Sequence, residues 1–239
     1  MCCNTCYYFP HSTTCSDAYY SYKCLTESES IRNALPEFKA MNTEFRKNRN
    51  TFLVCGSTRV KMTFIAKTFY DLKATTLEGD MVDFNVFRGR VVLIENVASE
   101  LNELQRRYPH RLVVLGFPCN QFGYQENCSN GEILNSLQHV RPGGGFQPNF
   151  TMFEKCDVNG TNTHPVFAYL KDKLPYPDDD PNSLVQDPKF LVWSPISRTD
   201  ISWNFEKFLI GPEGEPFKRY SKKFPTIDVE PDIQRLYKR

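Results

Sequence analysis

The sequence predicts an α/β protein in which parallel and antiparallel strands share one sheet. Residues 91–94 form an unbroken apolar run between charged residues, and residues 112–117 form a second apolar run, as is typical of strands buried on both faces of a parallel sheet. Apolar residues recur at helical intervals between the two runs. Near the C-terminus, residues 203–210 and 215–220 flank a Gly-Pro-Glu-Gly turn, which predicts an antiparallel hairpin.

Residues 1–61 differ from the rest of the chain and form an extension before the predicted domain, residues 62–239. Tyrosine and cysteine are frequent in the first 24 positions, and Pro36 interrupts the helical spacing of apolar residues between positions 31 and 45. We expect this terminal segment to be poorly ordered. Its acidic residues are atypical of a transit peptide.

Regular elements are expected from Met62 onwards. Residues 66–72 and 75–77, the turn 78–80 and residues 81–84 are typical of strand, turn and strand, which predicts an N-terminal β-hairpin. A strand over 90–97 then precedes a helix over 100–107, whose apolar face includes Leu101, Leu104 and Tyr108.

A polar loop, residues 116–127, follows the second apolar strand. Ser129 begins a helix that ends before Pro142 and whose apolar face contains Ile133, Leu134, Leu137 and Val140. The other predicted elements are a strand over 150–156, a helix over 164–174, an exposed loop over 175–188, the C-terminal hairpin and a short helix over 231–237. This order is compatible with a thioredoxin-like sandwich, a mixed sheet with helices on both faces.

The predicted connection between the two parallel strands is too short. A strand over 90–97 spans roughly 26 Å at about 3.3 Å per residue, whereas a helix over 100–107 spans about 12 Å at about 1.5 Å per residue. Parallel strands need a crossover of at least about a dozen residues, which residues 98–110 barely provide. Either the strands are shorter than the pattern indicates, or roughly two helical turns are missing near Ser99.

The composition is that of a globular protein, with 239 residues, 40% hydrophobic and 24% charged. A net charge of +1 excludes a general electrostatic attraction to nucleic acid. No apolar segment has the length of a membrane span, and the first thirty residues lack the apolar block of a secretory signal. We therefore expect a cytoplasmic protein.

The nine cysteines predict reduced thiols rather than a disulfide framework, because only Cys119, Cys128 and Cys156 lie in the larger part of the chain. Cys3 and Cys6 form a CxxC pair. The next cysteines do not supply the second pair of a zinc site, so we expect no bound metal.

Four long motifs follow one another from residue 89 to residue 221. They are GRVVLIENVAS at 89–99, GFPCNQFG at 116–123, RPGGGFQP at 141–148 and WNFEKFLIGPEGEPFKRYS at 203–221. With them, the chain resembles the glutathione peroxidases, and most closely their tetrameric cytosolic selenium-containing branch. The likeness runs from Met62 to the C-terminus with one interruption. It implies reduction of hydrogen peroxide and organic hydroperoxides by glutathione.

The interruption falls at the expected nucleophile. The resemblance places a selenocysteine, or a cysteine in some branches, directly after the NVAS segment. Here Ser99 is followed at once by Glu100, which matches the middle of the next helix. The nucleophile, its glycine and the first helical turns are therefore absent. A selenocysteine codon skipped in gene prediction explains this gap, and on this hypothesis residues 1–61 are upstream sequence joined in the same way.

The resemblance implies three further catalytic residues, Gln121 in the NQFG loop and Trp203 and Asn204 in the WNF segment. A chalcogenide nucleophile reacts as an anion, which uncharged N–H donors and a helix N-terminus stabilise. Without the resemblance, the sequence predicts only that Trp203 is a core residue and that Gln121 is a loop residue. Cys119 belongs to the structure of its motif, and a buried thiol is too unreactive to replace the nucleophile.

Glutathione carries two carboxylates, so cationic side chains are expected around its site. The resemblance implies Arg198, Lys222 and Lys223, although the two lysines also suit a solvated surface. The loop 175–188 and the RPGGG motif resemble the subunit contacts of a homotetramer. Thioredoxin-dependent members keep a resolving cysteine where residues 169–180 have none, so glutathione is the expected reductant.

We therefore expect a member of this family whose missing nucleophile prevents turnover. One alternative is a catalytically inactive variant that acts as an interaction partner and mixes with other subunits. Another is a cysteine-rich metal module, residues 2–24, with a peroxidase-like tail. Asn149 and Asn159 begin Asn-x-Thr sequons, which we interpret as chance matches because no signal peptide precedes them.

Overall fold

The computed structural model describes residues 53–55, 58–60, 66–96, 101–185 and 187–238. The chain forms two compact units, Met1–Phe64 and Ile65–Arg239. In the first unit, β1 (Leu53–Cys55) and β2 (Thr58–Val60) pair in antiparallel fashion. The helical pattern predicted between positions 31 and 45 and the CxxC pair lie outside the described residues.

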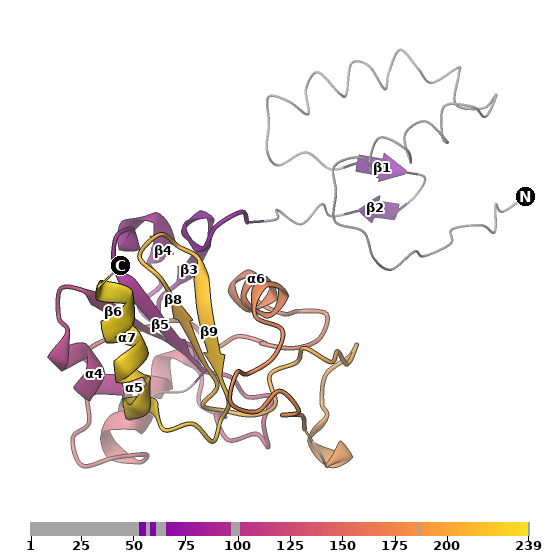
Figure 1. Ribbon diagram of the computed structural model, residues 1–239. Helices are drawn as coiled ribbons and strands as arrows, with labels where there is room; N and C mark the ends of the chain where they lie inside the picture. The colour runs from indigo at the N-terminus through magenta and orange to yellow at the C-terminus, as the bar shows by residue number, and fades with distance from the viewer. Residues whose placement is uncertain (1–52, 56–57, 61–65, 97–100, 186, 239) are drawn as a thin grey trace, which may run out of the picture. The chain divides into compact units, whose positions relative to one another are not determined.

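A five-stranded mixed sheet forms the centre of the second unit (Figure 1). In spatial order the strands are β7 (Thr151–Met152), β6 (Leu112–Gly116), β5 (Val91–Glu95), β8 (Lys207–Ile210) and β9 (Pro216–Tyr220). The pairs β5–β6 and β6–β7 are parallel, whereas β5–β8 and β8–β9 are antiparallel. The predicted parallel unit and C-terminal hairpin are therefore confirmed.

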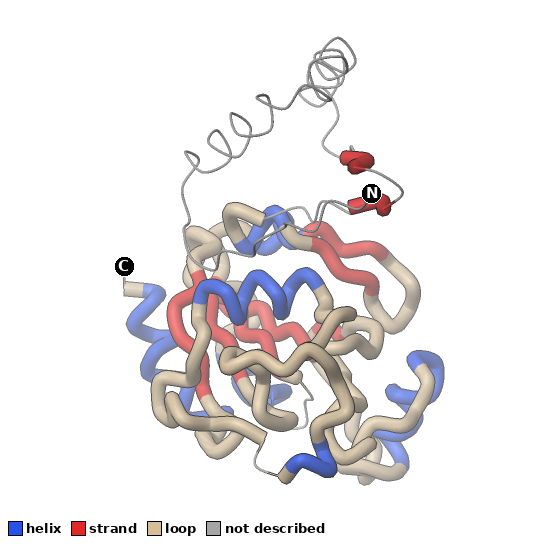
Figure 2. Tube along the Cα trace, turned by 90° about the vertical axis from the view of Figure 1, so that its right-hand side faces the viewer, coloured by secondary structure: helices blue, strands red, loops and turns tan. Residues whose placement is uncertain are grey.

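Helices cover both faces of this sheet, as predicted. Alternation along β5 directs Val92 and Ile94 to the face covered by α6 (Pro165–Lys173), and Val91 and Leu93 to the opposite face. The opposite face packs against α4 (Leu101–Arg107), α5 (Asn130–His139) and α7 (Glu230–Tyr237). Figures 1 and 2 show α6 and α7 on opposite sides of the sheet.

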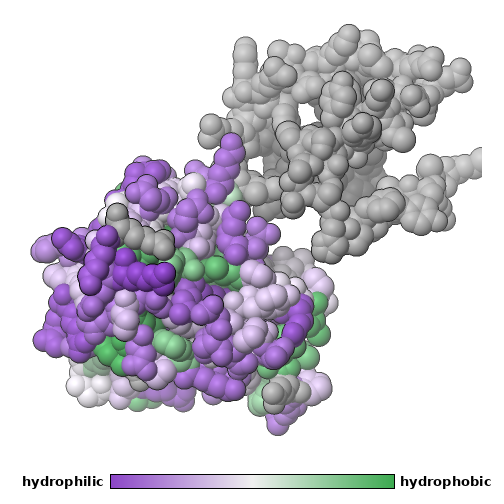
Figure 3. All heavy atoms as spheres, viewed as in Figure 1, coloured by the Kyte–Doolittle hydropathy of each residue, from purple (hydrophilic) through white to green (hydrophobic). Residues whose placement is uncertain are grey.

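On the face seen in Figure 3, hydrophilic side chains predominate, and apolar residues form small separate areas. Among the described residues, no helix has the length and apolar character needed to cross a membrane.

The predicted N-terminal hairpin consists of β3 (Lys73–Thr75) and β4 (Met81–Asp83), but the preceding segment is not a strand. Phe69–Asp71 forms a 3-10 helix instead. The Asp71 carboxylate accepts hydrogen bonds from the backbone N–H groups of Lys67 and Thr68, both at 3.0 Å. This local capping favours a helical turn over the extended chain predicted for residues 66–72.

Three other predicted elements differ from the structure. Only Thr151 and Met152 of the segment 150–156 lie in a strand, and β8 begins at Lys207 rather than at Trp203. In α5, Ile133 and Leu137 are buried, whereas Leu134 is 39% exposed and Val140, the residue that caps the end of the helix, is 75% exposed, so the predicted apolar face is narrower. Further 3-10 helices span Phe84–Phe87, Pro188–Phe190 and Thr226–Val229.

Candidate functional site

A turn that carries Trp203 and Asn204 is fixed to the carboxyl end of β5 by Asn96. The Asn96 side-chain amide donates to Trp203 O at 3.1 Å, and its Oδ1 accepts from the Glu206 N–H at 2.9 Å. The Asn96 carbonyl accepts from the Phe205 N–H at 3.1 Å, where Phe205 adopts a left-handed φ of 69°. These three bonds replace strand pairing for residues 203–206 and explain why β8 begins later than predicted.

Gln121 lies in the loop after β6, and its buried amide is bonded to a second loop. Its Oε1 accepts from the N–H groups of Val158 and Asn159 at 2.9 and 3.0 Å. Its Nε2 donates to Asn159 O at 3.0 Å, and the residue is 7% exposed. The orientation of the Gln121 amide is therefore fixed, and one hydrogen of its NH2 group is left for another acceptor.

The loop of Gln121 and the turn of Trp203 contact each other directly. The rings of Phe122 and Trp203 have centroids 5.7 Å apart, and Asn204 Nδ2 donates to Gln125 Oε1 at 3.0 Å. Asn204 is 2% exposed, and its Oδ1 has no hydrogen-bond partner among the described residues. The three predicted catalytic residues thus lie on two adjoining segments beside the end of β5.

Among the described residues, none accepts a hydrogen bond from the Trp203 indole N–H. The indole is held by its ring contacts instead, with the Phe190 centroid at 5.0 Å. A fixed and uncharged donor of this kind suits the stabilisation of an anion that forms next to it.

The three predicted cationic residues have different surroundings. Lys222 Nζ lies 5.4 Å from the centroid of the Trp203 ring, within the range of a cation–π contact. Lys223 pairs with Asp180 at 3.1 Å, and Arg198 donates to Asn182 Oδ1 at 3.2 Å. The structure therefore brings Lys222 to Trp203, whereas the contacts of Lys223 and Arg198 are with the loop 175–188.

Cys119 lies next to this site but is poorly suited to act as a nucleophile. The residue is fully buried, and burial raises the pKa of its thiol to about 11. Burial also raises the pKa of the nearby Cys156 thiol well above its ordinary value. Both sulfurs are therefore protonated at neutral pH, and a thiol is a much weaker nucleophile than a thiolate.

The Ser99–Glu100 junction lies outside the described residues, but the strand before it is shorter than predicted. The five residues of β5 span about 16 Å and the seven residues of α4 about 10 Å. The difference of about 6 Å corresponds to roughly one helical turn, not two. The predicted strand is too long, because β5 ends at Glu95.

A cavity of about 940 Å³ lies apart from Gln121 and Trp203 and is lined mainly by α4, Phe146, Asn149, Pro225 and Ile227. Within the described residues, no group of three or more His, Cys, Asp and Glu side chains is arranged to hold a metal ion.

Comparisons with known proteins identify relatives of this chain. A sequence model described as glutathione peroxidase matches residues 69–171. Glutathione peroxidase 2 of Homo sapiens is 70% identical over 187 residues, which cover 74% of this chain and 98% of that protein. The values are 71%, 74% and 98% for glutathione peroxidase 2 of Sapajus apella, and 69%, 74% and 98% for that of Mus musculus.

A solved structure supports the fold. The crystal structure of Trgpx in its apo form superposes with a TM-score of 0.50 at 27% identity, over 73% of this chain and 98% of that one. The fold is accordingly thioredoxin-like, as the sequence predicts. Together with the 70% identity across nearly the whole of a relative, these findings show that the chain belongs to the glutathione peroxidase family of oxidoreductases.

Proposed function

We propose that this chain is a glutathione peroxidase subunit without its peroxidatic residue. The parent activity is the reduction of hydrogen peroxide and organic hydroperoxides by glutathione. One observation carries the proposal: the loop of Gln121 meets the turn of Trp203 and Asn204 at the end of β5, just before Ser99. In the family, these residues surround a selenocysteine or cysteine.

The extent of the match supports a gap in this chain. The comparison with the human relative runs over 187 residues, whereas 74% of 239 residues is about 177. About ten positions of the relative thus have no counterpart here, as expected for a missing nucleophile and the helical turns that follow it. An in-frame TGA codon in the genomic DNA between the codons for Ser99 and Glu100 would explain the gap.

In the complete family site, the residues of this chain stabilise charge and bind the reductant. Trp203, Gln121 and Asn204 each have an N–H available to stabilise the chalcogenide that attacks the peroxide O–O bond. Lys222 supplies a positive charge for a glutathione carboxylate, and Arg198 and Lys223 extend this charge along the loop 175–188. A homotetramer and a cytoplasmic location rest on the likeness to the tetrameric cytosolic branch alone.

Glutathione consumption tests the proposal. The purified chain should show no turnover with hydrogen peroxide or cumene hydroperoxide above the rate without protein. A matched variant should gain measurable peroxide reduction when the roughly ten missing residues are restored between Ser99 and Glu100 from the human relative, with cysteine as the nucleophile. Turnover by the unaltered chain at rates typical of family members would contradict the absence of the nucleophile.

The gap also favours a second candidate, an inactive subunit that mixes with active ones. The described loop 175–185 and the RPGGG segment, to which subunit contacts are assigned by resemblance, are intact. Co-expression of the tagged chain with an untagged full-length family member tests this function. Co-purification in fixed proportion supports subunit mixing, and recovery of the tagged chain alone contradicts it.

A further inference from the structure

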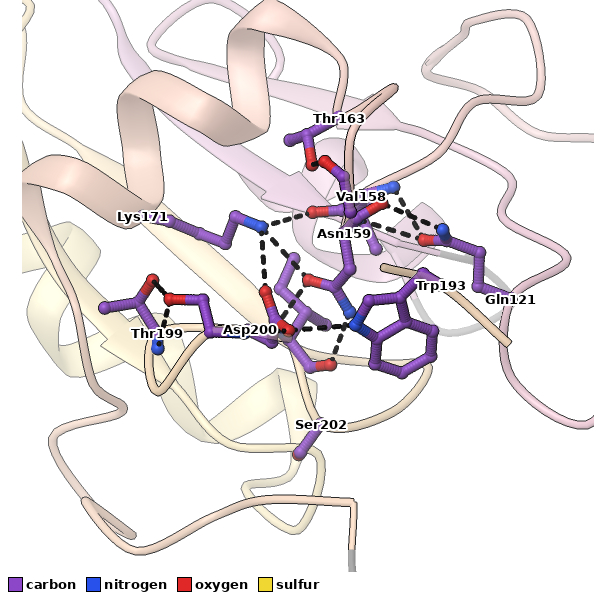
Figure 4. A network of polar contacts seen from close by, with 12 residues as sticks. Gln121, Val158, Asn159, Thr163, Lys171, Trp193, Thr199, Asp200 and Ser202 are labelled. Atoms are coloured by element: carbon purple, nitrogen blue, oxygen red, sulfur yellow. Dashed lines mark hydrogen bonds and ion pairs between the residues drawn. The ribbon is translucent and has the colours of Figure 1, made fainter. Parts of the chain in front are cut away.

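Asn159 lies at the centre of a buried polar network that joins the two parts of the candidate site (Figure 4). Its backbone N–H donates to Gln121 Oε1, and its C=O accepts from Gln121 Nε2, both at 3.0 Å. Its side chain bonds both backbone groups of Ile201, accepting from the N–H and donating to the C=O at 2.9 Å each. Ile201 precedes Trp203 by two residues, so Asn159 connects Gln121 to the segment that carries Trp203.

Lys171 fixes which way the Asn159 amide points. Lys171 Nζ donates to Asn159 Oδ1 at 3.1 Å, and also to Val158 O at 2.7 Å. An ammonium has donors only, so the oxygen of the Asn159 amide must face Lys171, and the NH2 group must face Ile201 O. Both residues are buried: Asn159 is 1% exposed and Lys171 is 8% exposed.

Asp200 completes the network and connects it to Trp193 and Ser197. Its Oδ1 pairs with Lys171 at 3.4 Å. Its Oδ2 accepts from the Trp193 indole N–H and from the Ser197 N–H, both at 2.8 Å. Burial lowers the pKa of Lys171, whereas Asp200 acts to raise it. The charge of Lys171 therefore depends on a partner that is itself held in place by two donors.

We propose that Asn159 is a positioning residue of the peroxidase site, which holds Gln121 and the Trp203 turn in one mutual geometry while Lys171 orients its amide. The inference rests on the proposed function, because that function gives Gln121 and Trp203 their roles. Asn159 acts through these residues and not on the peroxide. Catalytic donors must be held to within about 0.5 Å, and a displacement of about 1 Å can lower a rate by roughly 100-fold.

The chain as it exists allows a direct test by ¹H–¹⁵N spectroscopy. Asn159→Asp keeps the shape of the side chain but replaces the donor to Ile201 O with an oxygen. We expect shifts of the Trp203 indole signal, assigned with Trp203→Phe, and of the Gln121 side-chain amide signals. The control Asn162→Asp makes the same change at an exposed position three residues away and should move neither. Unchanged signals in folded Asn159→Asp protein would overturn the proposal.

Lys171→Met provides a second variant in case Asn159→Asp does not fold. It removes the charge that orients the Asn159 amide and should shift the same two sets of signals. Lys173→Met, on the exposed side of the same helix, should leave them in place. Equal effects of Lys171→Met and Lys173→Met on the signals would show that Lys171 has no orienting role.

Kinetics of the variant with the restored, cysteine-containing segment separate positioning from stability. There, Asn159→Asp should lower the second-order rate constant for the hydroperoxide by about 10- to 100-fold. The step with glutathione should change by less than about twofold, because Lys222 is untouched. Equal losses in both steps, or no loss, would overturn the proposal. If the restored variant has no activity at all, the proposed function fails, and the spectroscopic test of the Asn159 network still stands.

Discussion

Cys119 illustrates how the surroundings of one side chain decide its chemistry. At pH 8, a thiol with a pKa of about 11 has a thiolate fraction on the order of 0.001, compared with about 0.2 for an ordinary cysteine. We expect iodoacetamide at pH 8 to modify Cys119 at least about 10-fold more slowly in the folded chain than in urea. Peptide mass spectrometry measures both rates, with partly exposed Cys128 as the internal comparison. Equal rates for Cys119 in the two conditions would contradict the burial described above.

Gly214 is a position where the turn between β8 and β9 requires glycine. Its φ is +84°, and a Cβ built there would lie 2.6 Å from the ring of Tyr70. Gly214→Ala should lower the free energy of unfolding in urea by about 2–4 kcal/mol. Gly79 has a similar φ of +91° with no atom within 4 Å of such a Cβ. Gly79→Ala should therefore cost only about 1 kcal/mol, and equal losses would show that the ring contact is unimportant.

The sequence predicts some residues of the candidate site and gives no signal for others. Gln121, Trp203 and Asn204 are predicted because long motifs carry them. Asn96 and Asn159 act through hydrogen bonds to residues 107–110 and 38–42 positions away, which no local pattern indicates. An Asn directly after a buried strand is the one signal that suggests Asn96.

At the level of elements, a buried ion pair joins β9 to the start of β8. Arg219 and Glu206 are 1% and 0% exposed, and their side chains meet at 2.7 Å. Arg219 also donates to the backbone carbonyls of Leu174, Pro175, Thr199 and Asp200. One side chain thus fixes the hairpin to two segments, the residues after α6 and the loop that carries Asp200.

Glu206→Gln should be strongly destabilising, because it leaves the Arg219 charge buried without its carboxylate. The expected loss is about 3–5 kcal/mol in the free energy of unfolding in urea. Asp180→Asn breaks the pair with Lys223, whose side chain is 75% exposed, and should cost less than about 1 kcal/mol. Similar losses for both variants would show that burial does not set the strength of these pairs.

The predictions of helices and strands are correct where the apolar pattern is long, and they are wrong where side chains cap the backbone. The strands β5 and β6 are confirmed because burial on both faces leaves an unbroken apolar run, and the helix α6 is confirmed because burial along one stripe leaves a helical periodicity. The apolar content of residues 66–72 and 203–206 predicts strands that do not form. In the structure, Asp71 and Asn96 supply the bonds that a neighbouring strand would supply.

At the scale of the whole molecule, we propose that the folded domain begins near Met62. Where the structure describes side-chain burial, buried hydrophobic residues extend from Ala66 to Leu236. A chain that begins at Met62 should therefore unfold with the same free energy as the full chain, within about 0.5 kcal/mol. A chain that begins at Lys73 lacks buried Phe69 and Tyr70 and should lose at least about 3 kcal/mol. A large loss in the first truncation would place part of the fold upstream.

The burial of Asn159 also bears on how the molecule ages. Asn159-Gly160 is the kind of dipeptide that deamidates readily in a flexible chain, because the small glycine lets its backbone nitrogen attack the asparagine amide. In the folded chain, three hydrogen bonds to Ile201 and Lys171 fix the Asn159 side-chain amide, and the side chain is shielded from water. The folded state therefore protects the dipeptide, and aspartate at position 159 would mark molecules that have spent time unfolded.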